Sequence, residues 1–246
     1  MKNPALTIMV KITGLILALL TCQSTLGQIR FTEGTINANL NRSGIVDEIH
    51  DSPESNLDDD MYLFEEWLPG YVVFVNFSIY DQGKLRYNLA KDELEILLPD
   101  EGIKIAPLYI LKTFSFNKSA NDSLHFINAT KYTKYYGEDN KGIHEVLVND
   151  KISLLKLYYI KTVPANYIPA FDLGSKQAQL AIDQEFFLLS DDKLYEINRK
   201  KDFIDFFDKS SKLKSFMKKE RLKVTKESDL IQIIDHINKH NISMLN

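Results

Sequence analysis

The sequence predicts an α+β fold, mainly an antiparallel β meander that forms a sandwich or half-open barrel, followed by a small C-terminal appendix of three helices. Apolar and polar residues alternate with a period of two through much of residues 28–198, which is typical of half-buried strands. From residue 200 onward the apolar residues recur at a period of roughly 3.6, as on one face of a helix. We therefore expect a signal peptide (1–27), a β domain (28–198) and a helical appendix (199–246).

The centre of the predicted β domain is residues 71–98, which we interpret as three strands joined by two tight turns. Tyr71–Ile79 is rich in β-branched and aromatic residues, and Asp81–Gly83 supplies turn residues. Apolar and polar residues alternate from Leu85 to Leu89, and a second turn at Ala90–Asp92 leads into the third strand. Because the strands follow one another without intervening helices, we expect antiparallel pairing.

Further strands are predicted on both sides of this centre, to a total of roughly nine to eleven. They lie at residues 28–36, 103–106, 109–116, 123–130, 143–148, 152–160, 185–189 and 194–197. Between the first strand and the centre, the polar and acidic residues 37–60 predict a solvated loop. Residues 163–176, with two prolines and a glycine, predict another loop.

Three short apolar stripes define the helical appendix. Their members are Phe203, Ile204 and Phe207; Leu213, Phe216 and Met217; and Leu230, Ile233, Ile234 and Ile237. Asp208 and Thr225 precede the second and third stripes and are the expected N-caps. Helices of fewer than about 12 to 15 residues are marginal alone in water, so we expect these to pack together and against the β domain.

The N-terminus has the pattern of an export signal. Lys2 and Lys11 precede a mainly apolar run at Ile12–Leu20, which is shorter than the roughly 20 residues that span a bilayer. The small residues before Gln28 predict cleavage there. The alternative is a lipoprotein anchored through Cys22, although Leu20 and Thr21 before it do not suit that processing. Cleavage before Gln28 removes the only cysteine and with it any disulfide.

Charge is unevenly distributed along the chain. Residues 199–226 contain eleven Lys or Arg against four Asp or Glu, a balance of +7, which leaves −11 for the rest of a chain whose net charge is −4. Solvated helix faces are one explanation of this basic segment. The other is attraction to an acidic surface, either the protein's own β domain or the anionic cell envelope. Aromatic residues do not interleave with the basic ones as on a nucleic-acid surface, so no nucleic-acid partner is expected.

Several stretches resemble a family of uncharacterised exported proteins of Bacteroidota. The resemblance is carried by Trp67, Leu85–Asn88 with Asp92–Glu93, Glu145–Val148 with Leu154–Lys156, and Asp229–Asn238. It implies a bacterial protein that is exported to the periplasm, to the outer surface or into the medium. It implies no catalytic or ligand-binding residue.

Catalytic and metal-binding motifs are missing from the sequence. It has no glycine-rich phosphate loop, no G-x-S-x-G and no H-E-x-x-H. His236 and His240 lie four apart, as zinc ligands on a helix do, but have no obvious third ligand nearby. Asp92, Glu93 and Glu95 are acidic residues that a glycosidase could use, but on a strand flank they are typical solvent-facing charges.

We therefore expect a non-enzymatic binding or interaction module of the cell envelope, with no cofactor and no metal. Its partner would be an envelope protein, a lipid or a glycan. The alternative is a hydrolase acting on envelope glycan or lipid with carboxylates drawn from separate strands. The candidate binding residues are Trp67, Phe74, Arg86, Tyr87 and Asn88, which would act if they line one open face of the sheet.

Overall fold

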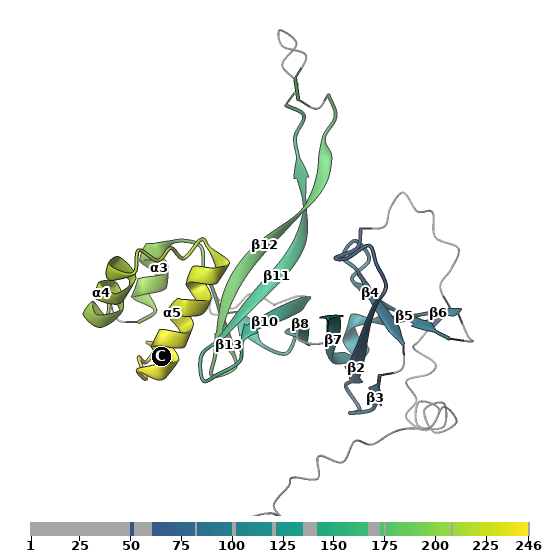
Figure 1. Ribbon diagram of the computed structural model, residues 1–246, viewed down its shortest axis with the longest axis horizontal. Helices are drawn as coiled ribbons and strands as arrows, with labels where there is room; N and C mark the ends of the chain where they lie inside the picture. Colours follow the sequence, from purple (N-terminus) through teal and green to yellow (C-terminus); the bar gives the residue numbers. More distant parts are fainter. Residues whose placement is uncertain are drawn as a thin grey trace, which may run out of the picture. The chain divides into compact units, whose positions relative to one another are not determined.

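The structure is a computed structural model that describes residues 50–51, 61–81, 83–99, 102–119, 122–134, 142–166, 173–174, 176–207 and 209–245. They all belong to one compact unit, residues 38–246. An antiparallel sheet dominates this unit and three helices lie near the C-terminus (Figure 1), which confirms the predicted α+β fold class. The predicted signal peptide, Cys22, the strand at 28–36 and most of the acidic loop lie outside the described residues.

Within the described residues, thirteen strands form one sheet. Their order is β1 (His50–Asp51), β6 (Gly102–Pro107), β5 (Glu93–Leu98), β4 (Lys84–Asn88), β2 (Leu68–Phe74), β7 (Leu111–Ser119), β8 (Asp122–Asn128), β10 (Ile143–Val148), β11 (Ser153–Val163), β12 (Gln179–Ser190), β13 (Lys193–Glu196) and β9 (Thr133–Lys134), with β3 (Ile79–Tyr80) paired to β2. The pairs are antiparallel except β13 with β9. In the described part of the chain β1 and β9 do not pair with each other, so the sheet is open.

The single strand predicted at Tyr71–Ile79 is wrong, because the chain folds back within it. β2 ends at Phe74 and β3 returns beside it, with Val73 opposite Ile79. The Asn76 side-chain oxygen accepts hydrogen bonds from the Ser78 N–H at 2.9 Å and from its hydroxyl at 2.7 Å. Such local side-chain bonds compete with a strand ladder and favour a turn. The turn is completed by Phe77, whose φ is +68°.

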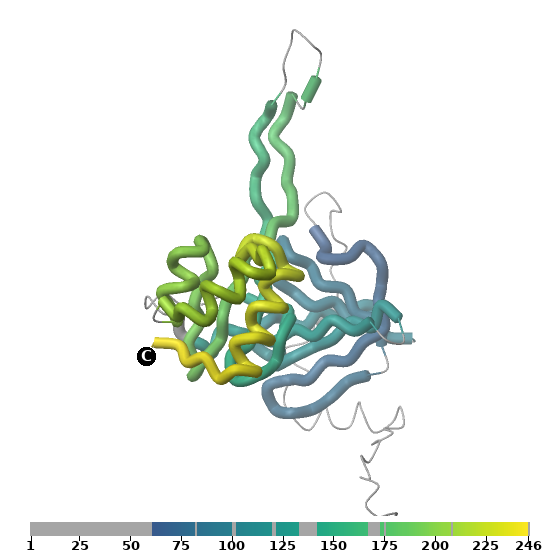
Figure 2. The backbone as a smooth tube through the Cα atoms, turned by 60° about the vertical axis from the view of Figure 1, so that its left-hand side comes forward, coloured from purple at the N-terminus to yellow at the C-terminus, as the bar shows by residue number. Residues whose placement is uncertain are grey.

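β11 and β12 form a hairpin longer than predicted. Ser153 lies opposite Leu189 at one end of the hairpin, and Val163 lies opposite Gln179 at the other. β12 therefore begins soon after the predicted loop at residues 163–176 and before the predicted strand at residues 185–189. Figure 2 shows the outer part of this hairpin as two strands side by side. There Leu180 and Ile182 are exposed.

The helices α3 (Lys200–Asp205), α4 (Ser211–Lys219) and α5 (Glu227–Lys239) share one hydrophobic core with the sheet. The core combines Ile152, Leu154, Phe186, Leu188, Tyr195 and Ile197 of the β part with Phe203, Ile204, Phe207, Leu213, Met217, Leu222, Val224, Leu230, Ile233, Ile234 and Ile237 of the helical part. This confirms the expectation that the helices pack against one another and against the β domain. None of the helices in the described ranges is long and apolar enough to cross a membrane.

The helix caps differ from the prediction. Ser210, rather than Asp208, precedes α4, and its hydroxyl accepts a hydrogen bond from the Leu213 N–H at 3.4 Å. Asp208 lies outside the described residues. Thr225 is not the cap of α5, because that helix begins after Lys226, whose carbonyl accepts the Leu230 N–H at 2.9 Å.

Candidate anion-binding groove

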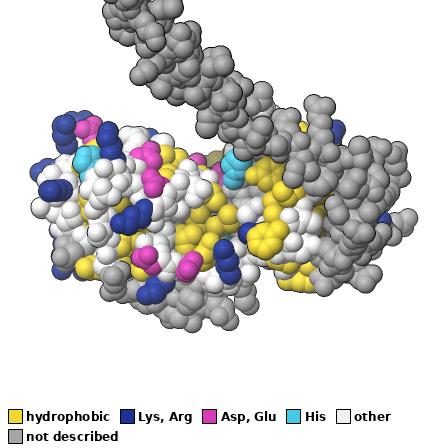
Figure 3. Space-filling view, turned by 90° about the horizontal axis from the view of Figure 1, so that it is seen from below, with side chains coloured by type: hydrophobic (Ala, Val, Ile, Leu, Met, Phe, Trp, Pro, Cys, Tyr) yellow, Lys and Arg dark blue, Asp and Glu magenta, His cyan; other side chains and the backbone are white. Residues whose placement is uncertain are grey.

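A strongly basic concavity lies between α3, α4 and the turns that follow them. Its cavity of about 870 Å³ is surrounded by the cationic side chains of Lys200, Lys201, Lys209, Lys214, Lys218, Arg221 and Lys223. Three buried apolar residues, Ile204, Met217 and Leu222, form its floor, and Asp205 is the one carboxylate in the lining. We call this the basic groove. Figure 3 shows Lys and Arg side chains, in dark blue, over the helical part at the left.

The end of α4 places two of these cations. The Leu222 N–H donates to the Met217 carbonyl at 2.9 Å, and the Arg221 N–H donates to the Lys218 carbonyl at 3.3 Å. This pair of bonds is the Schellman motif, which requires a left-handed residue after the helix. Arg221 occupies that position with φ +57°. The motif turns Leu222 into the core, while Arg221 and Lys223 on either side of it are exposed.

Lys209 is held in the same backbone conformation after α3. Its φ is +52°, and its N–H donates to the Ile204 carbonyl at 3.2 Å. In the left-handed conformation an L side chain approaches its own backbone too closely, at a cost of roughly 1–2 kcal/mol, so glycine is the usual residue at such positions. Backbone stability alone would therefore favour glycine over Lys209 and Arg221. Both positions instead supply cations to the basic groove.

The seven cations have no carboxylate partners within the described residues. Neighbouring cations do: Arg199 pairs with Asp202, and Lys226 pairs with Asp229. Seven like charges around one concavity produce a positive potential that attracts anions and that salt screens over about 8–10 Å. The basic groove is therefore suited to an anionic ligand.

The lining also limits the class of ligand. It contains no aromatic side chain, so it offers no surface on which the bases of a single-stranded nucleic acid could stack. Its one carboxylate, Asp205, does not supply the pair that glycoside hydrolysis uses.

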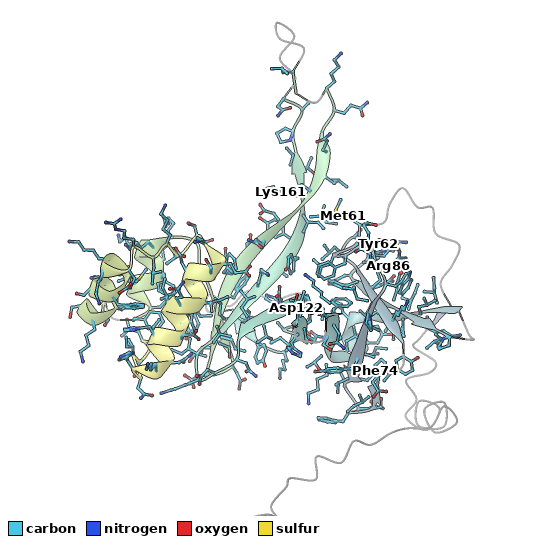
Figure 4. All side chains as sticks on the ribbon, in the orientation of Figure 1. Met61, Tyr62, Phe74, Arg86, Asp122 and Lys161 are labelled. Carbon is cyan, nitrogen blue, oxygen red and sulfur yellow. The ribbon has the colours of Figure 1, made fainter. Side chains whose placement is uncertain are left out.

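The structure brings together two of the five binding residues predicted from the sequence. The Arg86 guanidinium lies 3.7 Å from the centre of the Tyr62 ring and 4.5 Å from that of Trp67. It also forms an ion pair with Glu95 at 2.8 Å, and Glu95 accepts a hydrogen bond from the Tyr62 hydroxyl at 3.0 Å. Figure 4 shows Tyr62 and Arg86 side by side. The donors of Arg86 are thus already directed at Glu95, and this cluster joins β4 to β5.

The other three predicted residues are buried. Phe74 is in the core, away from Arg86 in Figure 4. Tyr87 points to the opposite face of β4 from Arg86, packs 5.8 Å from the Phe114 ring and bonds to Asp92. Burial and the neighbouring Asp92 charge hold the pKa of Tyr87 well above its usual range. Asn88 accepts hydrogen bonds from the N–H groups that follow it in the turn.

A buried ionic network, not identified from the sequence, lies under the start of α5. The Lys156 ammonium contacts Glu145 at 2.7 Å and Glu227 at 2.9 Å, and the Tyr158 hydroxyl donates to Glu145 at 2.7 Å. Burial by itself lowers the pKa of Lys156, but hydrogen bonds, led by the one to Glu145, outweigh it and raise that pKa. Burial raises the pKa of Tyr158 to about 12. This network links β10, β11 and α5.

His236 and His240 are involved in stacking. The centre of the His236 ring lies 3.7 Å from that of Phe216 and 4.1 Å from that of His240. A nitrogen of His240 lies 2.9 Å from the His236 carbonyl oxygen. Burial, with the charges of His240 and Lys239, lowers the pKa of His236. Within the described ranges no group of three or more His, Cys, Asp or Glu residues is arranged to hold a metal ion.

Comparison of the chain with protein-family models, with curated proteins and with solved structures finds no match in any of the three. The function proposed below therefore rests on the basic groove and on the sequence.

Proposed function

We propose that this protein is a non-enzymatic, exported protein of the cell envelope that attaches to an anionic phospholipid surface through the basic groove. The observation that supports the proposal best is the set of seven cations around one cavity, none paired with a carboxylate in the described part of the chain. Clusters of about four to eight Lys or Arg residues bind anionic lipid surfaces, and each contributes roughly 1 kcal/mol.

The kinds of residue in the groove favour lipid headgroups over a single small anion. Six of the seven cations are lysines, which act as mobile point charges rather than as fixed bidentate forks. Their aliphatic stems border an apolar floor of Ile204, Met217 and Leu222. Such a lining can bind the phosphates of several lipid headgroups on one membrane surface, while the aliphatic stems of the lysines contact apolar groups.

The proposed location in the cell envelope rests on the N-terminal signal and on the resemblance to exported proteins of Bacteroidota. Both remain predictions. The hydrolase alternative is not proposed, because no observation favours it. Asp92 bonds to Tyr87, and Glu95 is paired with Arg86.

Vesicle co-sedimentation tests the proposal. The protein recovered after export is mixed with vesicles of phosphatidylcholine alone or with added phosphatidylglycerol, at low and at high salt. We expect the added anionic lipid to strengthen binding, and high salt to remove that added binding. Reversing two groove charges, Lys214→Glu with Arg221→Glu, should weaken this binding on the order of 25-fold or more.

The matched control reverses two exposed cations outside the groove, Lys151→Glu with Lys193→Glu, and so has the same net charge. If both double variants lose binding equally, net charge rather than the groove is responsible. If neither loses binding, the proposed function is wrong.

A further inference from the structure

Four exposed apolar side chains lie in or near the turn that joins β2 to β3. They are Val75, Phe77, Ile79 and Tyr109, with exposed fractions of 50%, 70%, 49% and 64%. We call this the apolar tip. Large exposed apolar patches on soluble proteins usually mark a surface that contacts a partner or a membrane. Figure 3 views the molecule from the side on which β3 lies and shows hydrophobic side chains at its surface.

Local contacts hold the apolar tip together. The Val75 N–H donates at 2.9 Å to the carbonyl of Ile110, at the end of the 3-10 turn η3 (Leu108–Ile110) that carries Tyr109. The Lys112 ammonium lies 3.9 Å from the centre of the Phe77 ring. The tip is therefore a folded surface feature with a lysine at its edge.

Phe77 is unfavourable for folding in two respects. Its φ of +68° lies in the left-handed region, where a bulky side chain is strained and where Gly or Asn is preferred. The residue is 70% exposed, so it contributes little to the core. Strained residues that bury nothing indicate a role outside folding. Phe77 is thus expected to bury its ring in something other than this chain.

Charge and hydrogen bonding indicate a lipid bilayer. Residues 74–80 and 108–112 contain no acidic residue, and Lys112 is their only charged one. Most of the turn's backbone donors are paired: the N–H groups of Phe74, Val75, Phe77 and Ser78 have partners within the protein. Unpaired N–H groups are costly in lipid, so a turn with paired donors can enter it.

We propose that the apolar tip inserts into the boundary between headgroups and acyl chains of a lipid bilayer. Aromatic and aliphatic side chains favour that boundary, and a lysine beside them can reach the lipid phosphates. Insertion depends on apolar transfer rather than on anionic charge, so it is independent of the basic groove and adds a second kind of membrane contact.

The Phe77→Asn variant should lose membrane insertion without losing stability of the fold. Asn suits the left-handed backbone, so thermal unfolding should occur at the same or a higher temperature. Partition into neutral phosphatidylcholine vesicles at high salt should fall about tenfold. The control, Leu180→Asn, removes a side chain that is 60% exposed on β12 and should leave partition unchanged. The groove variant Lys214→Glu with Arg221→Glu should also keep this neutral-lipid binding.

Phe77→Trp gives a second readout that does not depend on loss of binding. Lipids brominated on their acyl chains should quench its added fluorescence, relative to the protein with Trp67 alone. Absence of added quenching, or a Phe77→Asn protein that partitions like the unaltered one, overturns the proposal. Sedimentation of the free protein provides a third outcome: a dimer that Phe77→Asn converts to a monomer would show that a second copy covers the tip.

Discussion

The side-chain amide of Asn238 forms two hydrogen bonds with the backbone of Ile152. It donates to the Ile152 carbonyl at 2.8 Å and accepts from the Ile152 N–H at 3.0 Å. One residue near the end of α5 thereby satisfies both backbone groups of a buried residue just before β11. This contact and the shared hydrophobic core together hold the helical part against the sheet.

Asn238→Ala should lower the free energy of unfolding by about 1–3 kcal/mol, because it leaves buried backbone groups without partners. Urea unfolding measures this loss, and hydrogen exchange should show lower protection of the Ile152 amide. The control is Gln232→Ala, since that exposed side chain bonds only within its own helix. Unchanged exchange at Ile152 in the Asn238 variant would contradict the expected role.

Lys156→Met should destabilise the protein at neutral pH by about 3–5 kcal/mol, because it leaves the buried Glu145 carboxylate without its cation. Adding Glu145→Gln removes that charge and should restore part of the loss. Chemical unfolding of the two single variants and the double variant gives the coupling between the residues. Additive effects would show that the ion pair does not stabilise the fold.

The same network predicts a loss of stability in alkali. The pKa values of Lys156 and Tyr158 are both raised in the folded protein, the latter to about 12. Their contribution is therefore fully present below the unfolded-state values of about 10 and is lost as the pH rises from 10 toward 12. Tyr158→Phe should make the decline in unfolding free energy between these pH values less steep. An equal slope in the variant and the unaltered protein would show that Tyr158 does not contribute to this loss of stability.

Arg221→Gly separates stability from binding at the basic groove. Glycine relieves the left-handed strain, so the free energy of unfolding should rise by about 1 kcal/mol. Loss of one cation should weaken binding to anionic vesicles about fivefold. Thermal unfolding and co-sedimentation of the same preparation measure the two effects. A variant that gains stability and keeps full affinity would remove Arg221 from the groove's function.

The predicted start of the mature protein is checked by intact mass. Cleavage before Gln28 gives a chain without cysteine and without lipid. A mass corresponding to a diacylated Cys22 start would instead show a lipoprotein.

Periodic patterns explain why much of the fold could be predicted. The alternation around Leu85 and Tyr87 places these residues in β4, and the stripe at Ile233 and Ile234 becomes the buried face of α5. The turn at Asn76 is not evident from the sequence because apolar residues surround it, although an Asn side chain can accept a hydrogen bond from the backbone two residues on.

The candidate site is harder to predict from the sequence than the fold is. The excess of cations at residues 199–226 is visible in the sequence, but their gathering around one cavity depends on how α3 and α4 pack. Lys156 follows Leu154 and Leu155 in an apolar strand, and its partner Glu227 is far away in sequence, so no local pattern pairs them. The sequence makes Trp67 and Arg86 binding candidates if they line an open face, but it does not indicate that Arg86 pairs with Glu95.

The most direct test of the central proposal is to locate the binding surface by nuclear magnetic resonance, from the amide shifts of the protein as bicelles containing phosphatidylglycerol are added. We predict salt-sensitive shifts concentrated on α3, α4 and the turn at Arg221, and their loss in the Lys214→Glu, Arg221→Glu protein. Binding that shifts the strand residues around Trp67 and Arg86 but leaves α3 and α4 unaffected would contradict the proposal.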